Sequence, residues 1–344
     1  MHRLSNVKIG RTATLVTTVA AVLISGLACR SDSQTQHKAR VAERIALIGM
    51  GKDHLSFAVL QATARQITGH KGRVTVEVLA SDHASPAEQQ ALLNGLPLDR
   101  YDAVCIHPVD PDAVAVEMQR LSATGTPVIA FGRDVPAASR SGYCGPTEGD
   151  LGKAVASACE LLLKGRSNSI ILLHGGTDNP TFSARYQSFK TAIVSVPGLS
   201  LLKEVDCHAN RVDAVGLVKA EARKYPRVAG WVFLGDWPLR GLAENDRLLP
   251  IGCGIVLCEG DPMYFDRIRD GRIEAMIGFD YREASMEAVY TAIRVFESSS
   301  RGMNVSEVSI APEIVTRKNL EQWEARWQSW CSGRASPATT SRGS

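Results

Sequence analysis

The segment IVLCEGDPMYFDRIRDGRIEAMIGFDYREAS, residues 255–285, contains two short apolar runs separated by a polar stretch. The runs, at 254–259 and 274–279, are dominated by aliphatic and aromatic residues, as expected of buried strands. The stretch 284–298 follows, with apolar residues three and four positions apart, which is typical of an amphipathic helix. This order of strands and connections predicts parallel βαβ units.

The same alternation of short apolar runs and longer amphipathic stretches continues from Ile45 to Trp330. The expected strands are 44–49, 73–80, 102–107, 126–131, 169–174, 200–205, 230–234, 254–259, 274–279 and 306–315. The expected helices include 55–67, 86–96, 112–125, 151–165 and 284–298. Strands this apolar must be covered on both faces. We therefore expect an α/β fold of two doubly wound parallel-sheet, Rossmann-like lobes rather than one very wide sheet.

The composition is that of a globular protein: of 344 residues, 44% are hydrophobic and 22% are charged. The chain has 39 Lys and Arg against 36 Asp and Glu, and three of the basic residues lie in the first 28. The remainder is neutral and offers no charged surface for a phosphate backbone. No nucleic-acid partner is expected.

Residues 1–28 are predicted to be a signal peptide. A basic region with Arg3, Lys8 and Arg11 precedes the uncharged apolar run ATLVTTVAAVLISGLA at 13–28. This run is shorter than the roughly 20 residues that cross a bilayer, and it ends in small residues. A short permanent anchor helix is the alternative. Either interpretation places the body of the chain outside the cytoplasm.

The tetrapeptide Gly26-Leu27-Ala28-Cys29 is similar to a bacterial lipobox. The resemblance implies lipidation of Cys29 and localisation to the periplasm or cell envelope through a membrane anchor. Residues 29–43 would then be a lipidated tether, with a reach of about 20 Å by random-coil scaling. Residues 331–344 have no periodic pattern and are expected to form a disordered tail.

Seven further cysteines follow Cys29, and an odd number cannot pair completely. Cys105 and Cys258 lie in apolar runs, where buried thiols are expected. The spacing of Cys253 and Cys258 is only weak evidence for a metal or a disulfide, because no Cys/His cluster has the spacing of a zinc site. Neither a metal nor a cofactor is expected.

Polar and aromatic residues follow the carboxyl ends of several expected strands, where doubly wound sheets bind ligands. The candidate ligand-binding residues are Phe57, Arg133, Asp134, Thr147, Arg185, Asp236, Trp237, Glu259, Phe279 and Asp280. Each residue taken alone is equally well explained as a helix cap or a turn residue. Together they predict one ligand site shared by two lobes.

The order of these segments resembles the type I periplasmic solute-binding proteins, the ribose- and galactose-binding-like receptors of ABC sugar importers. Residues 103–114 are similar to the family's strand that ends in Pro and then Asp, and 125–136 to its fourth strand. Residues 143–156 are similar to its crossover into the second lobe. The most specific match is 255–285, which is similar to the pattern GFDG-x-P-x-x-L-x-x-I-x-x-G-x-I-x-A-T-V-x-Q. The resemblance covers 44–330 and implies a type I periplasmic binding protein fold.

The resemblance also implies roles for individual residues. Arg133 is aligned with a ligand-binding Arg of the family, and Arg185 with a second Arg near the start of a helix. Asp236 stands at the place of a ligand-binding Asn and Glu259 at that of a ligand Asp. Gly132 replaces the customary Asp, which leaves the identity of the solute open.

Three further residues are placed by the same comparison. Phe57 keeps the aromatic residue of the family's first turn, and Phe279 and Asp280 lie near its glutamine. The implied lobes are 44–146 plus 280–303 and 147–279 plus 304–330. Chain crossings near residues 145, 280 and 303 would form a multi-strand hinge.

These residue types suit a carbohydrate. Arg133 and Arg185 are rigid donors, carboxylates are acceptors, and Phe57, Trp237 or Phe182 would stack on a sugar ring. Arginines that face carboxylates leave no net charge, as a neutral monosaccharide requires, whereas an unpaired arginine would favour a sugar acid. The resemblance implies a monomeric, non-enzymatic receptor that delivers this carbohydrate to an ABC permease.

Other functions were weighed against this one. The sequence Gly49-Met50-Gly51 begins like a dinucleotide-binding loop, but His54 stands where the third glycine is required, and neither a G-x-S-x-G nor a P-loop pattern is present. An exported NAD-dependent or hydrolytic enzyme is therefore disfavoured. A lactose-repressor-like regulator would begin with a DNA-binding helix-turn-helix in place of the export signal. A receptor that signals to a membrane kinase remains an alternative that the sequence does not separate from a transport receptor.

Trp323, Trp327 and Trp330 are four and three positions apart, so they share one face of a terminal helix. We expect this face to pack on the body of the protein, and a partner-docking patch is the alternative.

Overall fold

The computed structural model describes residues 42–334, except 72, 98, 164–167, 241, 243–245 and 299–305. The expected signal peptide, the lipidation site Cys29 and nearly all of the tether lie outside the described residues. The same is true of the tail from residue 335 onward.

The first sheet, which defines the N-terminal lobe, has six parallel strands in the order β2-β1-β3-β4-β5-β11. These strands are β1 (Arg44–Ile48), β2 (Thr75–Leu79), β3 (Ala103–Ile106), β4 (Val128–Phe131), β5 (Gly142–Gly145) and β11 (Ser306–Ser309). The helical elements of this lobe are α1 (Ser56–Lys71), α2 (Pro86–Asn94), α3 (Pro111–Ala123), η1 (Ala137–Ser139) and α9 (Tyr281–Ser298).

The second sheet, which defines the C-terminal lobe, has the order β7-β6-β8-β9-β10-β12, and only β12 runs antiparallel to its neighbour. Its strands are β6 (Ser169–His174), β7 (Ser200–Asp206), β8 (Gly230–Phe233), β9 (Gly254–Leu257), β10 (Ala275–Phe279) and β12 (Pro312–Thr316). Its helical elements are α4 (Glu148–Ala158), η2 (Cys159–Leu162), α5 (Pro180–Ile193), α6 (Arg211–Lys224), α7 (Trp237–Arg240), η3 (Pro262–Tyr264) and α8 (Phe265–Arg269). The last helix is α10 (Leu320–Ser332). Two doubly wound α/β lobes are thus confirmed.

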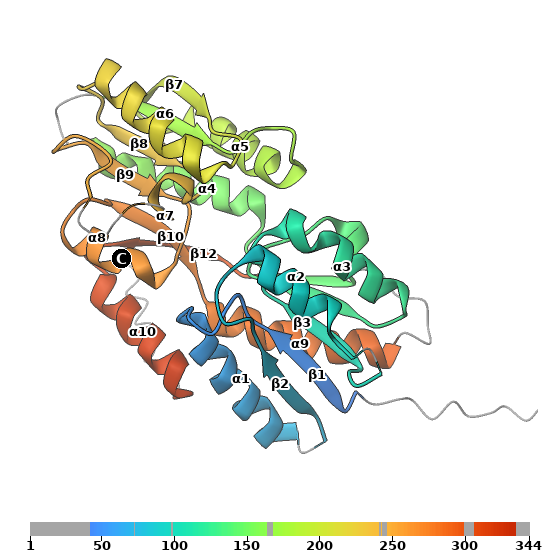
Figure 1. Ribbon diagram of the computed structural model, residues 1–344. Coiled ribbons are helices and arrows are strands. Elements are labelled where there is room, and N and C mark those ends of the chain that lie inside the picture. The colour runs from blue at the N-terminus through green and yellow to red at the C-terminus, as the bar shows by residue number, and fades with distance from the viewer. Residues whose placement is uncertain are drawn as a thin grey trace, which may run out of the picture. The chain divides into compact units, whose positions relative to one another are not determined.

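Each central strand is apolar on both faces because helices cover both faces of its sheet (Figure 1). Ile45 and Leu47 of β1 face the core beneath α1 and α9, whereas Ala46 and Ile48 face α2 and α3. In the C-terminal lobe, α4 and α5 cover one face of the sheet and α6 covers the other. The alternation of side chains along a strand requires this arrangement.

The expected strand 306–315 is in fact two strands that belong to different sheets. β11 pairs with β5, whereas β12 pairs with β10. The amide of Ile310 still donates to the carbonyl of Gly145 at 3.0 Å, and Pro312, which has no N–H, begins the next strand. The third crossing therefore lies between β11 and β12, not near residue 303, and 306–309 belong to the N-terminal lobe.

The tryptophan face of α10 packs on the body, as expected. Trp323, Trp327 and Trp330 are 3%, 8% and 0% exposed. The helix lies beside α1 in Figure 1 and also contacts α8 and β12, so it joins the two lobes. α10 includes Cys331 and Ser332, which the sequence analysis assigned to the disordered tail. Gly333 ends it with a left-handed φ of 70°.

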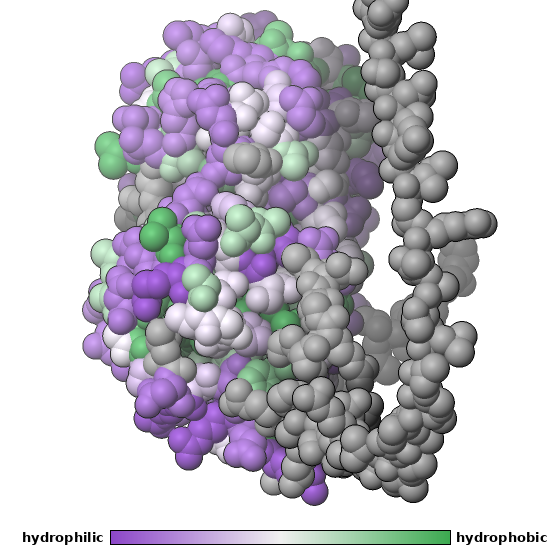
Figure 2. Space-filling model, turned by 90° about the vertical axis from the view of Figure 1, so that its right-hand side faces the viewer, coloured by the Kyte–Doolittle hydropathy of each residue, from purple (hydrophilic) through white to green (hydrophobic). Residues whose placement is uncertain are grey.

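The described surface is mainly polar. On the face shown in Figure 2, the hydrophobic side chains form small separate patches among hydrophilic ones. Large apolar side chains that are strongly exposed include Val116, Val194, Val212 and Ile251, which lie far apart in the sequence. Within the described residues, no helix has both the length and the apolar composition to cross a membrane. The described cysteines, including Cys253 and Cys258, are free thiols.

Replacing Trp330 by alanine is expected to lower the free energy of unfolding by about 3–5 kcal/mol, because a fully buried indole is lost and leaves a cavity. Urea denaturation followed by circular dichroism measures this change. Val212→Ala is the control, since Val212 is 83% exposed and its truncation should change stability by less than about 0.5 kcal/mol. Equal stability of the two variants would contradict the role of α10.

Candidate ligand-binding site

A cavity of about 220 Å³ lies between the carboxyl-terminal edges of the two sheets. Its walls come from both lobes, through the segments that follow β1, β3 and β4 in one lobe and β6, β8, β9 and β10 in the other. The structure brings seven of the ten predicted site residues to this wall: Arg133, Asp134, Arg185, Asp236, Trp237, Glu259 and Phe279. Phe182, the alternative stacking residue, also lines it.

Three predicted residues are not part of the cavity wall. Thr147 is the N-cap of α4, where its hydroxyl accepts the amide N–H of Asp150 at 3.0 Å. Asp280 accepts the amide N–H of Glu283 at the start of α9. Phe57 lies in the first turn of α1, close to Gly49. Thr147 and Asp280 thus cap the starts of helices, which is the other common role of polar residues at strand ends.

Several wall residues are not among the ten candidates, although three of them, His54, His107 and Glu148, belong to the segments that follow strands. They are chiefly His54, His107, Glu148, Arg240, Asp261, Tyr281 and Trp327. The sequence could have indicated Arg240, because it lies four positions after Asp236, a spacing that allows an ion pair, and the two side chains are paired. No sequence pattern indicated Trp327 as a site residue, because the tryptophan spacing of α10 predicted only burial.

Arg185 is held by Glu148 in a bidentate pair. Its Nε donates to Glu148 Oε2 at 2.6 Å and its Nη2 donates to Glu148 Oε1 at 3.0 Å. Its Nη1 donates to the carbonyl of Leu234 at 2.7 Å. The two paired side chains are only 13% and 14% exposed. Burial by itself lowers the pKa of this guanidinium, but the neighbouring Glu148 carboxylate outweighs it and raises the pKa overall.

Arg133 forms a corresponding pair that joins the lobes. Its Nη2 donates to Glu259 Oε2 at 2.7 Å, and its Nη1 donates to the carbonyl of Val109 at 2.8 Å. Arg240 and Asp236 form the third pair, in which Asp236 also accepts the hydroxyl of Tyr264 at 2.9 Å. Each arginine of the cavity wall therefore has a carboxylate partner. The wall also contains Asp110, Asp112, Asp134 and Asp261, so its carboxylates outnumber its arginines.

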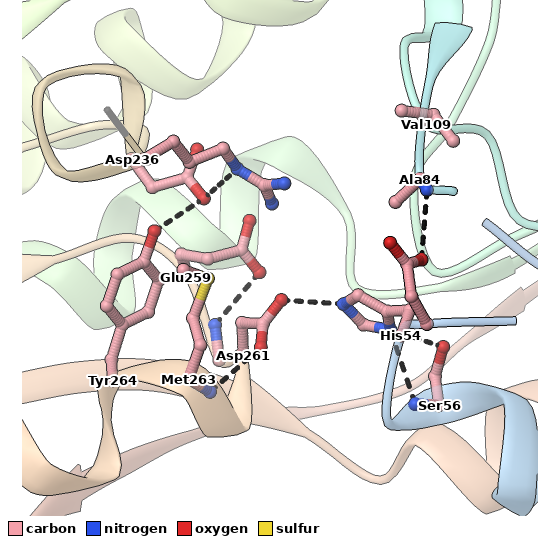
Figure 3. A network of polar contacts seen from close by, with 12 residues as sticks. His54, Ser56, Ala84, Val109, Asp236, Glu259, Asp261, Met263 and Tyr264 are labelled. Atoms are coloured by element: carbon pink, nitrogen blue, oxygen red, sulfur yellow. Dashed lines mark hydrogen bonds and ion pairs between the residues drawn. The ribbon is translucent and has the colours of Figure 1, made fainter. Parts of the chain in front are cut away.

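A second contact between the lobes runs through His54 (Figure 3). The amide N–H of Ser56 donates to His54 Nδ1, which leaves the proton on Nε2. Nε2 then donates to Asp261 Oδ2 at 2.7 Å. Burial alone would raise the pKa of Asp261, but the hydrogen bond from His54, the Met263 amide and the charge of Arg240 lower it to about 2. Asp261 is thus a buried carboxylate that stays ionised.

Aromatic rings form much of the remaining wall. His107 Nδ1 and the Tyr281 hydroxyl are 2.8 Å apart, and burial lowers the pKa of His107 well below its usual value, so this imidazole is neutral. Trp327 stacks on Tyr281 with ring centroids 5.8 Å apart. Phe182 meets Trp237 edge-on, with centroids 5.4 Å apart.

Chemically, the cavity combines paired charges, hydrogen-bond donors and acceptors, and apolar ring surfaces. Such a wall, in which carboxylates outnumber arginines, suits a small polar molecule that is not an anion and exposes some C–H surface. Among the residues that the structure describes, no group of three or more His, Cys, Asp or Glu could hold a metal ion.

Comparisons with known proteins agree with this architecture. A family model described as a periplasmic binding protein domain matches residues 45–299. None of the curated proteins compared with the chain matches it.

Solved structures show the same fold at low sequence identity. The glucose-galactose binding protein GanP from Geobacillus stearothermophilus has a TM-score of 0.65 and 17% identity, covering 82% of this chain and 99% of that one. An ABC transporter solute-binding protein from Burkholderia graminis, solved in complex with D-arabinose, has a TM-score of 0.61 and 17% identity, with 80% and 96% covered. A periplasmic ribose ABC transporter protein from Conexibacter woesei has a TM-score of 0.64 and 12% identity, with 85% and 98% covered.

The lowered pKa of Asp261 predicts an acid-sensitive contribution to stability. A carboxyl group whose pKa falls from 3.8 to about 2 on folding stabilises the protein by about 2 kcal/mol above pH 4, and this contribution disappears as the pH falls toward 2. Asp261→Asn should therefore lose about 2 kcal/mol at pH 7 and show a weaker pH dependence between pH 4 and 2.

Urea denaturation at several pH values measures both effects. Asp266→Asn is the matched control, because Asp266 lies nearby in α8 with its side chain 63% exposed. Its stability should follow the native curve. An Asp261→Asn curve parallel to the native one would contradict the ionised, buried state of Asp261.

Proposed function

This chain belongs to the family of periplasmic binding protein domains, and we propose that it is an extracytoplasmic receptor for a monosaccharide or related carbohydrate. The observation that carries the proposal is the cavity between the lobes, whose wall combines paired ionic groups with aromatic rings. Sugar hydroxyls both donate and accept hydrogen bonds, and sugar rings carry C–H faces that pack on aromatic side chains. The neighbours that are named for arabinose, ribose, glucose and galactose support the same ligand class.

We further propose that the lobes close around the ligand by hinge bending. The chain passes between the sheets after β5, after β10 and between β11 and β12, so three adjacent crossings form the hinge. Arg133–Glu259 and His54–Asp261 bridge the lobes beside the cavity, and these contacts support a closed form. A closed form differs in surface from an open one, so a membrane partner can recognise it.

The partner that we propose is the membrane permease of an ABC importer. The receptor would work in the periplasm or cell envelope as a monomer, anchored through a lipid on Cys29. A receptor that passes the closed form to a membrane kinase is the alternative. Catalysis is not part of the proposal. Ser56 lines the cavity and its Oγ lies 2.6 Å from His54 Nδ1, but this residue is only 1% exposed.

A thermal-shift screen of the purified protein against pentoses, hexoses, sugar acids and polyols tests the ligand class. A ligand at about 100 times its Kd should stabilise the native state by about 2.7 kcal/mol and raise the melting temperature. The bound sugar should be recovered unaltered after hours of incubation. Failure of every sugar and polyol to shift the melting temperature would refute carbohydrate binding.

Arg133→Met should weaken binding of the best ligand from this screen at least tenfold, because the variant loses a donor in the cavity and a bond between the lobes. Isothermal titration calorimetry measures the affinity. Arg100→Met is the control, since Arg100 forms an exposed pair with Glu77 away from the cavity. An Arg133 variant with native affinity would show that this side chain does not contact the ligand or stabilise closure.

Removing the protein from the cells that produce it should abolish high-affinity uptake of the labelled sugar that binds it. The native gene should restore uptake, and the Arg133→Met gene should restore it only at higher sugar concentration. Normal uptake combined with a lost transcriptional response to the sugar would instead favour the signalling receptor.

A further inference from the structure

Glu148 and Arg185 both line the cavity, and Glu148 pairs with the guanidinium of Arg185. We propose that Glu148 determines ligand charge: by neutralising Arg185 it makes the cavity reject anionic sugars such as uronates and accept their uncharged counterparts. This inference rests on the proposed function, because it assumes that the ligand is a carbohydrate. It assigns specificity to a residue of the first turn of α4 that is not among the ten candidate residues.

The geometry of the pair leaves Arg185 little freedom to turn to another anion. Glu148 occupies the Nε and Nη2 edge of the guanidinium, which is one of the two edges that can bind a carboxylate in a bidentate manner. The Leu234 carbonyl accepts from Nη1. Glu148 engages one edge of the guanidinium and the Leu234 carbonyl accepts from a nitrogen of the other, so a bidentate sugar carboxylate would compete with one of them. A single hydroxyl requires only one of the remaining N–H groups.

The backbone around Glu148 is fixed by close packing of α4 on α5. A Cβ atom on Gly152 would come within 2.5 Å of the Arg185 carbonyl, so the two helices approach as closely as glycine permits. The Ser188 hydroxyl donates to the Gly149 carbonyl at 2.6 Å. Glu148 therefore cannot be carried away from Arg185 without separating these two helices.

The electrostatic consequence follows from burial. An anion placed beside Arg185 would also lie beside the Glu148 carboxylate, and like charges repel strongly where water is largely excluded. Displacing the Glu148 side chain instead would leave a carboxylate that is 14% exposed without its partner. A neutral hydroxyl is not repelled by Glu148 and does not require the Glu148–Arg185 pair to break.

Glu259 neutralises Arg133 in a similar way, but its pair joins the two lobes. Its removal would change closure together with charge. Glu148 and Arg185 both belong to the C-terminal lobe, so their pairing does not depend on closure. Glu148 is thus the residue at which ligand charge can be tested separately from lobe movement.

The test is the affinity of native protein and Glu148→Gln for three probes of matched shape, measured by calorimetry: D-galactose, D-galacturonate and the methyl ester of D-galacturonate. The matching glucose series is measured in parallel. Native protein should bind the neutral ester at least tenfold more tightly than the anion. Glu148→Gln should lower the ratio of ester affinity to anion affinity at least tenfold by tightening anion binding. The reason is that glutamine keeps the size of the side chain and removes its charge.

Two further variants isolate the cause. Adding Arg185→Gln to Glu148→Gln should abolish the gain, since the freed guanidinium is then absent. Glu313→Gln removes a glutamate that forms a bidentate pair with Arg326 outside the cavity wall, so it should keep the native ratio. A purely structural role of Glu148 would weaken all probes equally.

The outcomes separate this inference from the proposed function. Equal binding of anion and ester by the native protein overturns the inference without requiring any variant to fold. A folded Glu148→Gln protein with the native ratio also overturns it, while neutral sugar binding by the native protein would leave the proposed function in place. Absence of binding to every sugar and polyol of the screen, whatever its charge, would overturn the proposed function itself.

Discussion

A buried guanidinium must be paired, and this constraint organises the space between the lobes. Water is largely excluded there, so an unpaired charge would cost several kcal/mol. Arg185 and Arg240 find their carboxylates within the C-terminal lobe, whereas Arg133 reaches Glu259 across the gap. Both lobes line the site, and the Arg133–Glu259 and His54–Asp261 contacts depend on the position of one lobe relative to the other. The neutralisation of Arg133 therefore depends on the relative position of the lobes.

The hinge includes the short connection between β11 of the first sheet and β12 of the second sheet. β11 extends the first sheet in parallel, and after Ile310 and Ala311 the chain enters the second sheet as its antiparallel edge strand β12. Because this connection is short, the two sheet edges that it joins must lie next to each other. α10 then returns to pack on α1. The tryptophan face is consequently a structural seam between lobes as well as part of the cavity wall through Trp327.

Sequence patterns predicted the order of strands and helices because burial on both faces of a parallel strand leaves a clear apolar run. They also predicted seven wall residues, since position at the carboxyl end of a strand is a property of the chain. They did not predict partners such as Glu148 for Arg185 or Asp261 for His54, because pairing depends on distances between separate segments. Thr147 and Asp280 were expected to line the site and do not. At both positions the end of a strand is followed directly by the start of a helix, and the side chain caps that helix.

The glycine at position 132, where the resembling family has an aspartate, has a physical reason in this protein. Gly132 has a φ of 72°, which a side chain would strain. A Cβ atom there would also lie 3.0 Å from His107 Nε2 and 3.3 Å from the Phe279 ring. The neutral imidazole and the phenyl ring thus occupy the space that an aspartate would need. Because position 132 carries no carboxylate, Arg133 is neutralised by Glu259 from the other lobe. The glycine at position 132 therefore affects the packing of the two rings, the pairing of Arg133 and the contact between the lobes.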